Sequence, residues 1–360
     1  MSKKILAMMI AVIMVVGMLP MAVLADDYVA QIGSTKYTTF AEAVNDAGED
    51  DTIQLLANVT LTSAIYNKPL TIDLNSKTLF ITDYVRFNGN TKVFGGTINA
   101  DNAYSSDGII CANYHNSNAN TLTLQNITVS AKNVKYTTGL FYIYDSDNTL
   151  ILDNVTVNVS GQSSGSGSGV FYSGSSFNRG NVVIKNNTTI TAENVDAIFF
   201  ATEVNLDGAT ITCSDVHRPV FRQVSGTVEN STITVESIDE GQALIADVKG
   251  NNSGVIKFEN TTMTAPEDTP VTNLNNEGSN VIADPESSIG DGEGVSAFAA
   301  SVDGVNYVEL EDALKALTSG AELKLLSDIT IDTNWDRRST GATITVPATI
   351  NGNGHTIRSA

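Results

Sequence analysis

Cysteine, tryptophan and aromatic residues in general are scarce in this sequence of 360 residues. It contains two cysteines and one tryptophan, and aromatic residues make up 7% of it. Two cysteines do not indicate a disulfide framework. Cys111 and Cys213 fall at different points of the repeat described below, so we expect both to be small buried apolar residues.

Basic residues are scarce as well. The chain has 20 Lys and Arg against 40 Asp and Glu, which gives a formal net charge of −20. A surface this acidic repels nucleic acid and anionic lipid, so we expect neither as a partner. An acidic polysaccharide would need a local basic cleft against this background.

Long hydrophobic runs are absent after the first 25 residues, and no later stretch is long enough to span a bilayer. Residues 3–4 are lysines, residues 5–16 are nearly all apolar, and small residues precede a cleavage point after Ala25. This pattern predicts a secretory signal peptide and a secreted or cell-surface protein. The alternative is a membrane anchor, which Gly17 and Pro20 disfavour because they interrupt the run.

What the chain does have is a repeat. The segment 121–129 reads TLTLQNITV, and its pattern of two alternating apolar residues, a turn residue, Thr and a further apolar residue returns along the chain. The Thr positions are separated by 19 to 33 residues, which is typical of one coil of a solenoid. They are Thr78, Thr97, Thr128, Thr156, Thr189, Thr210, Thr232 and Thr262.

The turn residue explains how one coil bends. It is Asn, Gly or, once, Ser, and Asn and Gly adopt positive φ most readily. A bend there directs the next apolar residues inward, and stacked coils then bury a common core. We therefore predict an all-β solenoid, a right-handed parallel β-helix whose handedness follows the general crossover rule. Eight coils give a rod roughly 38 Å long.

The residues before the first coil differ from the repeat. Residues 29–38 are typical of a hairpin around Gly33, and 52–61 of a strand pair. Between them, the segment from Thr39 to Glu42 matches a capping box that begins an amphipathic helix. We predict that this helix covers the end of the solenoid, where an exposed sheet edge would otherwise pair with another chain. A small independent binding module is the alternative.

The beginning of the chain is repeated near its end. Residues 302–307, 310–314, 323–331 and 349–357 parallel 32–37, 40–44, 53–61 and 71–79. The sequence thus predicts a first module at 26–294, with its cap at about 27–61 and coils at about 70–290, and a second similar module at 295–360. The second module contains one coil, and we expect it to be truncated in a fragment; a C-terminal plug is the alternative.

These features carry a family resemblance. The strings IGSTKYTTFAEAV at 32–44, DTIQLLANVTL at 51–61 and KPLTIDLNSKTL at 68–79 are similar to modules of large surface proteins of Gram-positive bacteria, and the chain resembles the pectate-lyase-like family of right-handed parallel β-helix proteins. The resemblance covers the mature chain. It implies the architecture and leaves activity open, because this fold supports lyases, hydrolases, adhesins and spacers.

A lyase resembling this family would use an Arg base in an Arg-x-Pro-x-x-Arg setting with acidic Ca²⁺ ligands. The nearest match is DVHRPVFR at 215–222, whose candidate catalytic residues are Asp215, His217, Arg218 and Arg222. It departs from the motif, because Arg218 directly precedes the proline, and the preceding strands lack an acidic ligand set. The alternative is that His217 and Arg218 lie on a bend and pair with Asp215 or with acids of neighbouring coils.

Two neighbouring segments contain residue types that occur in binding sites. Tyr142 and Tyr144 near acidic residues resemble a sugar-binding face, but we expect them to be exposed positions of a strand whose other positions, Phe141 and Ile143, are core. Asp145 and Asp147 could ligate Ca²⁺, which prefers six to eight oxygens, but the spacing favours a turn. No cofactor is therefore expected.

The sequence predicts a non-catalytic secreted or cell-surface protein, an adhesin or spacer whose loops contact glycans. Duplicated modules, acidic charge and low aromatic content favour it. The alternative is a polysaccharide lyase or glycoside hydrolase, favoured by the fold and by residues 215–222. A third option is self-association through an uncovered coil end.

Overall fold

The computed structural model of the chain describes residues 28–113, 119–161, 168–174, 179–246, 248, 254–272, 281–331, 344 and 346–359. The predicted signal peptide and its cleavage point lie outside these residues. Among the described residues, no helix has the length and apolar character to cross a membrane.

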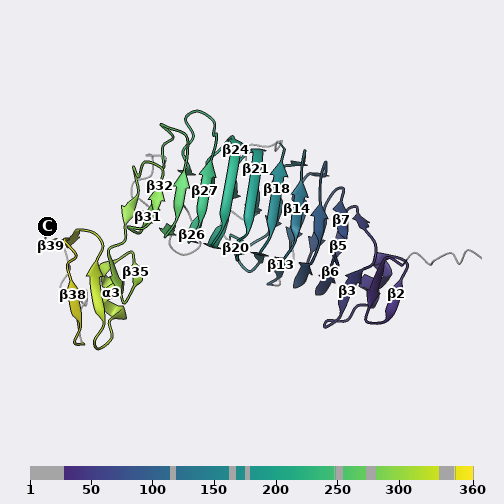
Figure 1. The fold of residues 1–360 in the computed structure, drawn as a ribbon, viewed down its shortest axis with the longest axis horizontal. Coiled ribbons are helices and arrows are strands. Elements are labelled where there is room, and N and C mark those ends of the chain that lie inside the picture. Colours follow the sequence, from purple (N-terminus) through teal and green to yellow (C-terminus); the bar gives the residue numbers. More distant parts are fainter. Residues whose placement is uncertain are drawn as a thin grey trace, which may run out of the picture.

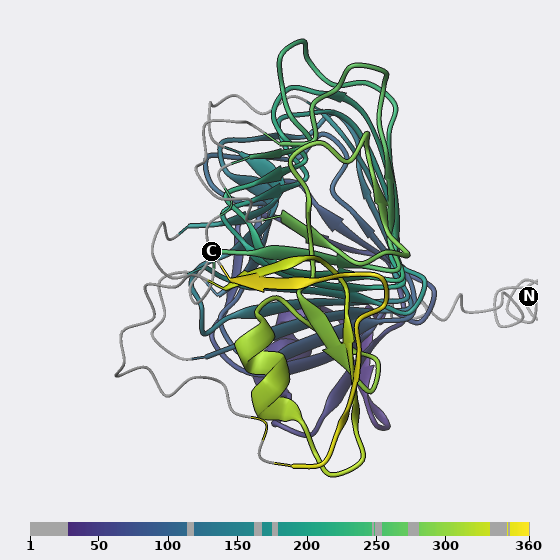
Figure 2. The same ribbon diagram turned by 90° about the vertical axis from the view of Figure 1, so that its left-hand side faces the viewer.

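Most of the chain is arranged in three long sheets, and every pairing between successive coils in them is parallel (Figure 1). The chain visits the three sheets in turn, once per coil. This arrangement fits the predicted β-helix. Figure 2 shows the coils end on, nested around a common interior, with the second module in front of them.

Sheet A consists, in order, of β2 (Thr35–Tyr37), β1 (Ala30–Ile32), β3 (Thr52–Leu55), β6 (Leu70–Asp73), β9 (Thr91–Phe94), β13 (Thr121–Gln125), β17 (Thr149–Asp153), β20 (Asn181–Lys185), β23 (Glu203–Asp207), β26 (Ser225–Glu229), β29 (Ile256–Glu259), β31 (Val281–Ala283) and β33 (Ser296–Ala297). Sheet B consists of β4 (Val59–Leu61), β7 (Thr78–Ile81), β10 (Thr97–Asn99), β14 (Thr128–Ala131), β18 (Thr156–Ser160), β21 (Thr189–Val195), β24 (Thr210–Val216), β27 (Thr232–Val235), β30 (Thr262–Thr264) and β32 (Ser288–Ile289). Sheet C consists of β5 (Ala64–Tyr66), β8 (Val85–Phe87), β12 (Ile110–Ala112), β16 (Gly139–Ile143), β19 (Gly169–Ser173), β22 (Phe199–Phe200), β25 (Phe221–Arg222) and β28 (Ile245–Ala246). A short pair beside them is β11 (Tyr104–Ser105) with β15 (Lys135–Tyr136).

The turn from sheet A to sheet B has the conformation that the repeat predicts. All eight turn residues of the repeat have positive φ, between 47° and 78°. They are Ser76, Gly95, Asn126, Asn154, Asn186, Gly208, Asn230 and Asn260. The asparagine side chains also bond from coil to coil: Asn154 Nδ2 donates to Asn126 Oδ1 at 2.7 Å, and Asn260 Nδ2 to Asn230 Oδ1 at 2.8 Å.

The interior is lined by residues at matching positions of successive coils. On sheet C, Phe141, Phe171, Phe199 and Phe221 are fully buried, and consecutive ring centroids lie 5.0 to 5.1 Å apart. The prediction that Phe141 and Ile143 belong to the core is confirmed. Cys111 and Cys213 are buried and unbridged as expected, and burial raises the pKa of each thiol to about 12.

The N-terminal helix α2 (Phe40–Asp46) has the predicted capping box: Thr39 Oγ1 accepts from the Glu42 amide, and the Glu42 carboxylate accepts from the Thr39 amide. Phe40 is buried and its ring lies edge-on to Tyr66 at 6.2 Å, which places the helix at the first coil (Figure 1). The predicted strand pair at 52–61 needs a correction. Strands β3 and β4 form, but they belong to sheets A and B and do not pair with each other.

The second module repeats the start of the first. Strands β35 (Val305–Tyr307), β34 (Ala300–Val302), β36 (Glu322–Leu325) and β38 (Thr349–Asn351) form one sheet, β37 (Ile329–Ile331) pairs with β39 (Ile357–Ser359), and α3 (Leu310–Ala316) corresponds to α2. A small apolar contact joins it to the first module through Ile282, Phe298 and Leu326.

Candidate functional site

The structure places the predicted catalytic candidates at the end of β24 and in β25. Asp215 has positive φ, +49°, and its side chain is hydrogen-bonded to Ser237 of the next coil. The Asp215 amide donates to Ser237 Oγ at 2.7 Å, and Ser237 Oγ donates to Asp215 Oδ1 at 3.1 Å. Asp215 therefore stabilises a bend, and the expected pairing of His217 with Asp215 does not form.

His217 is held between the coils on either side. Its Nδ1 lies 3.3 Å from both carboxylate oxygens of Asp239, and its Nε2 lies 3.0 Å from Asn194 Oδ1. The predicted pairing with an acid of a neighbouring coil is thus confirmed, with Asp239 as the partner. Through these contacts the imidazole bridges the coils on either side of its own.

The two arginines face different surroundings. The Arg218 amide donates to the Asp196 carbonyl at 2.7 Å, which fixes the backbone of the bend. The Arg222 guanidinium lies over the Phe200 ring, 4.6 Å from its centroid, a distance at which a cation is attracted to the ring face.

Arg222 follows three aromatic side chains in one column on the outer face of sheet C. The register of the sheet aligns Tyr142, Tyr172, Phe200 and Arg222, and ring centroids are 5.8 Å and 5.3 Å apart. The expectation that Tyr142 is exposed is wrong, because only 7% of it is accessible. The rings are tilted to one another by 32° and 49° and contact each other from coil to coil, so the column joins coils, and the buried Tyr142 presents no open face that would pack on a sugar.

Asp145 and Asp147 form the turn that the sequence favoured over a metal site. Asp145 Oδ1 accepts from the Asp147 amide at 3.2 Å and from Asn148 Nδ2 at 2.6 Å. Within the described ranges there is no group of three or more His, Cys, Asp or Glu side chains arranged to hold a metal ion.

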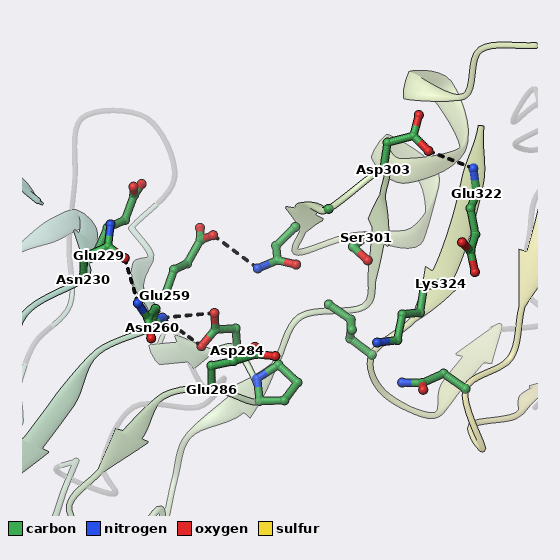
Figure 3. A pocket seen from close by; sticks show the side chains of 15 residues that line it. Glu229, Asn230, Glu259, Asn260, Asp284, Glu286, Ser301, Asp303, Glu322 and Lys324 are labelled. Atoms are coloured by element: carbon green, nitrogen blue, oxygen red, sulfur yellow. Dashed lines mark hydrogen bonds between the residues drawn. The ribbon is translucent and has the colours of Figure 1, made fainter. Parts of the chain in front are cut away.

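A cleft of about 640 Å³ lies between the two modules. Figure 3 shows carboxylates on both of its walls: Glu229, Glu259, Asp284 and Glu286 from the first module, and Asp303 and Glu322 from the second, with Lys324 among them. Sequence reasoning missed this cleft, because its walls come from segments that only the packing of the modules brings together.

Glu259 is the carboxylate of this cleft that contacts both modules. Its Oε2 accepts from Asn306 Nδ2 of the second module at 3.2 Å. Burial, followed by the charges of Glu229 and Asp284, raises the pKa of Glu259. The Asn306 hydrogen bond and the charge of Lys257 oppose this rise in the pKa, and the effect of the Asn306 bond ranks between those of Glu229 and Asp284. The cleft is thus a place where like charges are held together.

Two signals in the sequence could have found the partners of His217. Asn194 precedes it by 23 residues and Asp239 follows it by 22, which is close to the coil length of this part of the repeat. Aligning coils by their threonines places His217 and Asp239 at the same position, seven residues after Thr210 and Thr232, whereas Asn194 falls two positions earlier, five residues after Thr189.

The comparisons with known proteins found no match. No family model matches the chain, and neither a curated protein nor a solved structure matches it.

Proposed function

We propose that the protein is a non-catalytic, secreted or cell-surface β-helix of the pectate-lyase-like, right-handed type, acting as a glycan-contacting adhesin or as a spacer. Stacked coils form a stiff rod, and each coil contacts only its neighbours, so the number of coils sets the reach of the module. The acidic surface keeps such a rod soluble and away from anionic lipid.

The observation that carries this proposal is the bridge made by His217. The His217 ring nitrogens face Asn194 and Asp239, and the Arg222 guanidinium lies over Phe200. His217 and Arg222, two of the candidate catalytic residues, thus contact side chains of neighbouring coils, as the side chains of a scaffold do.

Turnover assays on the mature chain, residues 26–360, test the proposal. It is incubated with pectins, alginates and neutral glycans, with and without Ca²⁺; ultraviolet absorbance detects unsaturated uronates and a reducing-end assay detects hydrolysis. We expect no product on any substrate, and retention of at least one glycan if the protein is an adhesin. Product formation that disappears in Arg218→Ala would overturn the proposal and make the chain a lyase or hydrolase.

A further inference from the structure

The outer face of sheet B carries two columns of side chains that, apart from Phe80, are polar and uncharged. The parallel register aligns one residue of each coil in each column, so the side chains of a column follow the axis of the rod. The first column is Thr78, Thr97, Thr128, Thr156, Thr189, Thr210, Thr232, Thr262 and Ser288. The second, two residues further along each strand, is Phe80, Asn99, Ser130, Asn158, Thr191, Thr212, Thr234 and Thr264.

Four consecutive coils have threonine in both columns, from β21 to β30. Neighbouring parallel strands lie about 4.8 Å apart, and residues i and i+2 of a strand lie about 6.6 Å apart, so the eight hydroxyl groups form a two-dimensional lattice with these spacings. The lattice begins next to Thr156, whose Oγ1 is 3.4 Å from that of Thr189. Because threonine is restricted at χ1, its hydroxyl is held in place before any partner binds.

The two columns are uncharged, whereas the next position along β21 on the same face is the exposed Glu193. No position of either column is acidic or basic, although the chain has a net charge of −20. The equivalent outer column of sheet A contains Asp153, Lys185, Asp207, Glu229 and Glu259. An anionic partner is repelled by the molecule as a whole, and a cationic one would bind elsewhere, so the lattice suits a neutral partner.

The regular spacing of the hydroxyl groups indicates that the partner is itself ordered and repetitive. Each hydroxyl contributes only about 0.5–1.5 kcal/mol as a hydrogen bond, so binding needs many bonds made at once. A soluble flexible glycan loses conformational freedom when it binds, whereas an ordered surface has lost it already. A rigid rod and an ordered surface with its own repeating hydroxyl groups can form such bonds over several coils together.

We propose that the threonine lattice of β21, β24, β27 and β30 binds the ordered surface of an insoluble neutral polysaccharide. This inference rests on the proposed function as a glycan-contacting protein and names its ligand class and its contact face. Both columns are accessible here: Thr189, Thr210, Thr232 and Thr262 are exposed, as are Thr191 and Thr264, and Thr212 and Thr234 are half-buried.

The test is co-sedimentation of the mature chain with microcrystalline cellulose, chitin and granular starch, beside calcium alginate and soluble glucan fragments. The variant is Thr191→Val, Thr212→Val, Thr234→Val, which removes three hydroxyls and keeps the β-branched shape. The matched control is Thr123→Val, Thr149→Val, Thr227→Val on the outer face of sheet A, where these side chains are half-buried. Thermal unfolding confirms that both variants are folded.

We expect the wild-type chain to be retained on at least one insoluble neutral polysaccharide. The sheet B variant should lose affinity by about tenfold or more, because it lacks three hydrogen bonds. The sheet A control should bind as the wild type does. Equal binding of both variants overturns the assignment to this face, while glycan contact as such still stands. Binding to alginate or to soluble fragments alone overturns the ligand class. Inhibition of ice growth without polysaccharide retention overturns it too, since ice is the other ordered hydroxyl-bearing surface. Product formation, by contrast, would overturn the non-catalytic function itself.

Discussion

Residues 30–61 and 300–331 fold in the same way but are supported differently. In both, a hairpin strand pairs antiparallel with the strand that follows a seven-residue helix: Ala30 lies opposite Leu55, and Ala300 lies opposite Leu325. The helices differ in burial, since Phe40 is buried in the first module whereas Leu310 is only half-buried in the second. The first module is followed by a long stack of coils, and the described part of the second by one further strand in each of its two sheets.

The difference teaches that local sequence specifies the coil, while its neighbours determine how much the coil is stabilised. Ile72 and Ile350 occupy equivalent positions, paired with Ile53 and Leu323. Ile72 is fully buried, whereas Ile350 is 51% exposed. In a stack, each repeat covers the apolar face of the next one, so the burial of a residue depends on whether another coil stacks directly on its own.

The largest expected effect on stability comes from shortening the equivalent apolar residues of the two modules. Ile72→Ala should lower the free energy of unfolding by about 2–5 kcal/mol, because it leaves a cavity in the stack. Ile350→Ala should change it by less than about 0.5 kcal/mol, as for other exposed positions. Urea unfolding followed by circular dichroism measures both. Similar losses in the two variants would show that Ile350 is covered in solution.

A second experiment concerns a turn that the two modules share. Asn75 and Asn353 have φ of +48° and +47°, and each side chain donates to a carbonyl, Leu55 O at 3.0 Å and Leu325 O at 3.1 Å. Replacing either asparagine by alanine should cost about 1–2 kcal/mol, because alanine tolerates positive φ poorly. Replacement by glycine is the control, since it accepts positive φ and isolates the loss of the side-chain bond. Unequal costs in the two modules would refute a shared local turn.

The helix caps should differ by a smaller amount. Thr39 closes a capping box, whereas the corresponding N-cap residue of α3 is Glu309, whose side chain makes no capping bond. Thr39→Ala should destabilise the first module by about 1 kcal/mol, and Glu309→Ala should have almost no effect. Thermal unfolding of the two variants beside the wild type measures the difference. The prediction fails if Glu309→Ala costs as much as Thr39→Ala.

The smallest expected effect concerns pH and two carboxylates of the same sheet. The pKa of Glu259 is raised by burial and by neighbouring carboxylates, so its ionisation in the folded protein is a cost. This cost is absent below the ordinary Glu pKa and is complete above the raised one, so stability should fall as pH rises between them. Glu259→Gln should remove that fall and stabilise the protein at pH 7.

The pKa of Asp153 is shifted in the opposite direction, downward, so the pH dependence of stability that it causes is reversed. The hydrogen bond from Asn186 is the first cause that lowers its pKa, and Gln125 and Lys185 add to it. The stability that the ionised Asp153 contributes is present above the ordinary Asp pKa and is lost as pH falls through the lowered one. Asp153→Asn should therefore destabilise at pH 7 and have little effect in strong acid. Urea unfolding of both variants across the pH range is the measurement, and parallel pH profiles would contradict these assignments.

Much of the fold could be predicted from the sequence because its determinants are local. Asn126, Asn154 and the other turn residues adopt positive φ. Most of them are asparagine or glycine, which tolerate this conformation better than other residues. Thr39 and Glu42 form the capping box because both lie within one turn of the helix. The alternation of Leu122 and Leu124 with polar residues determines which face of β13 is buried.

The candidate site was less predictable, because partners of one side chain come from different coils. His217 and Asp239 are 22 residues apart in the sequence, and only stacking places them within 3.3 Å. Tyr142 alternates with Phe141 as an exposed residue would, yet only 7% of it is accessible, and the ring of Tyr172 in the next coil lies 5.8 Å from its own ring.

The sequence by itself therefore determined the coil: its turns, its apolar face, its cap and the duplication that begins a second module. The tertiary structure alone decided what the coils make together. It aligned threonines from four coils into a lattice, turned a histidine into a bridge, and brought carboxylates of two modules into one cleft. The physical reason is that backbone conformation depends on adjacent residues, whereas charge, exposure and contact depend on stacking distances that no single coil contains.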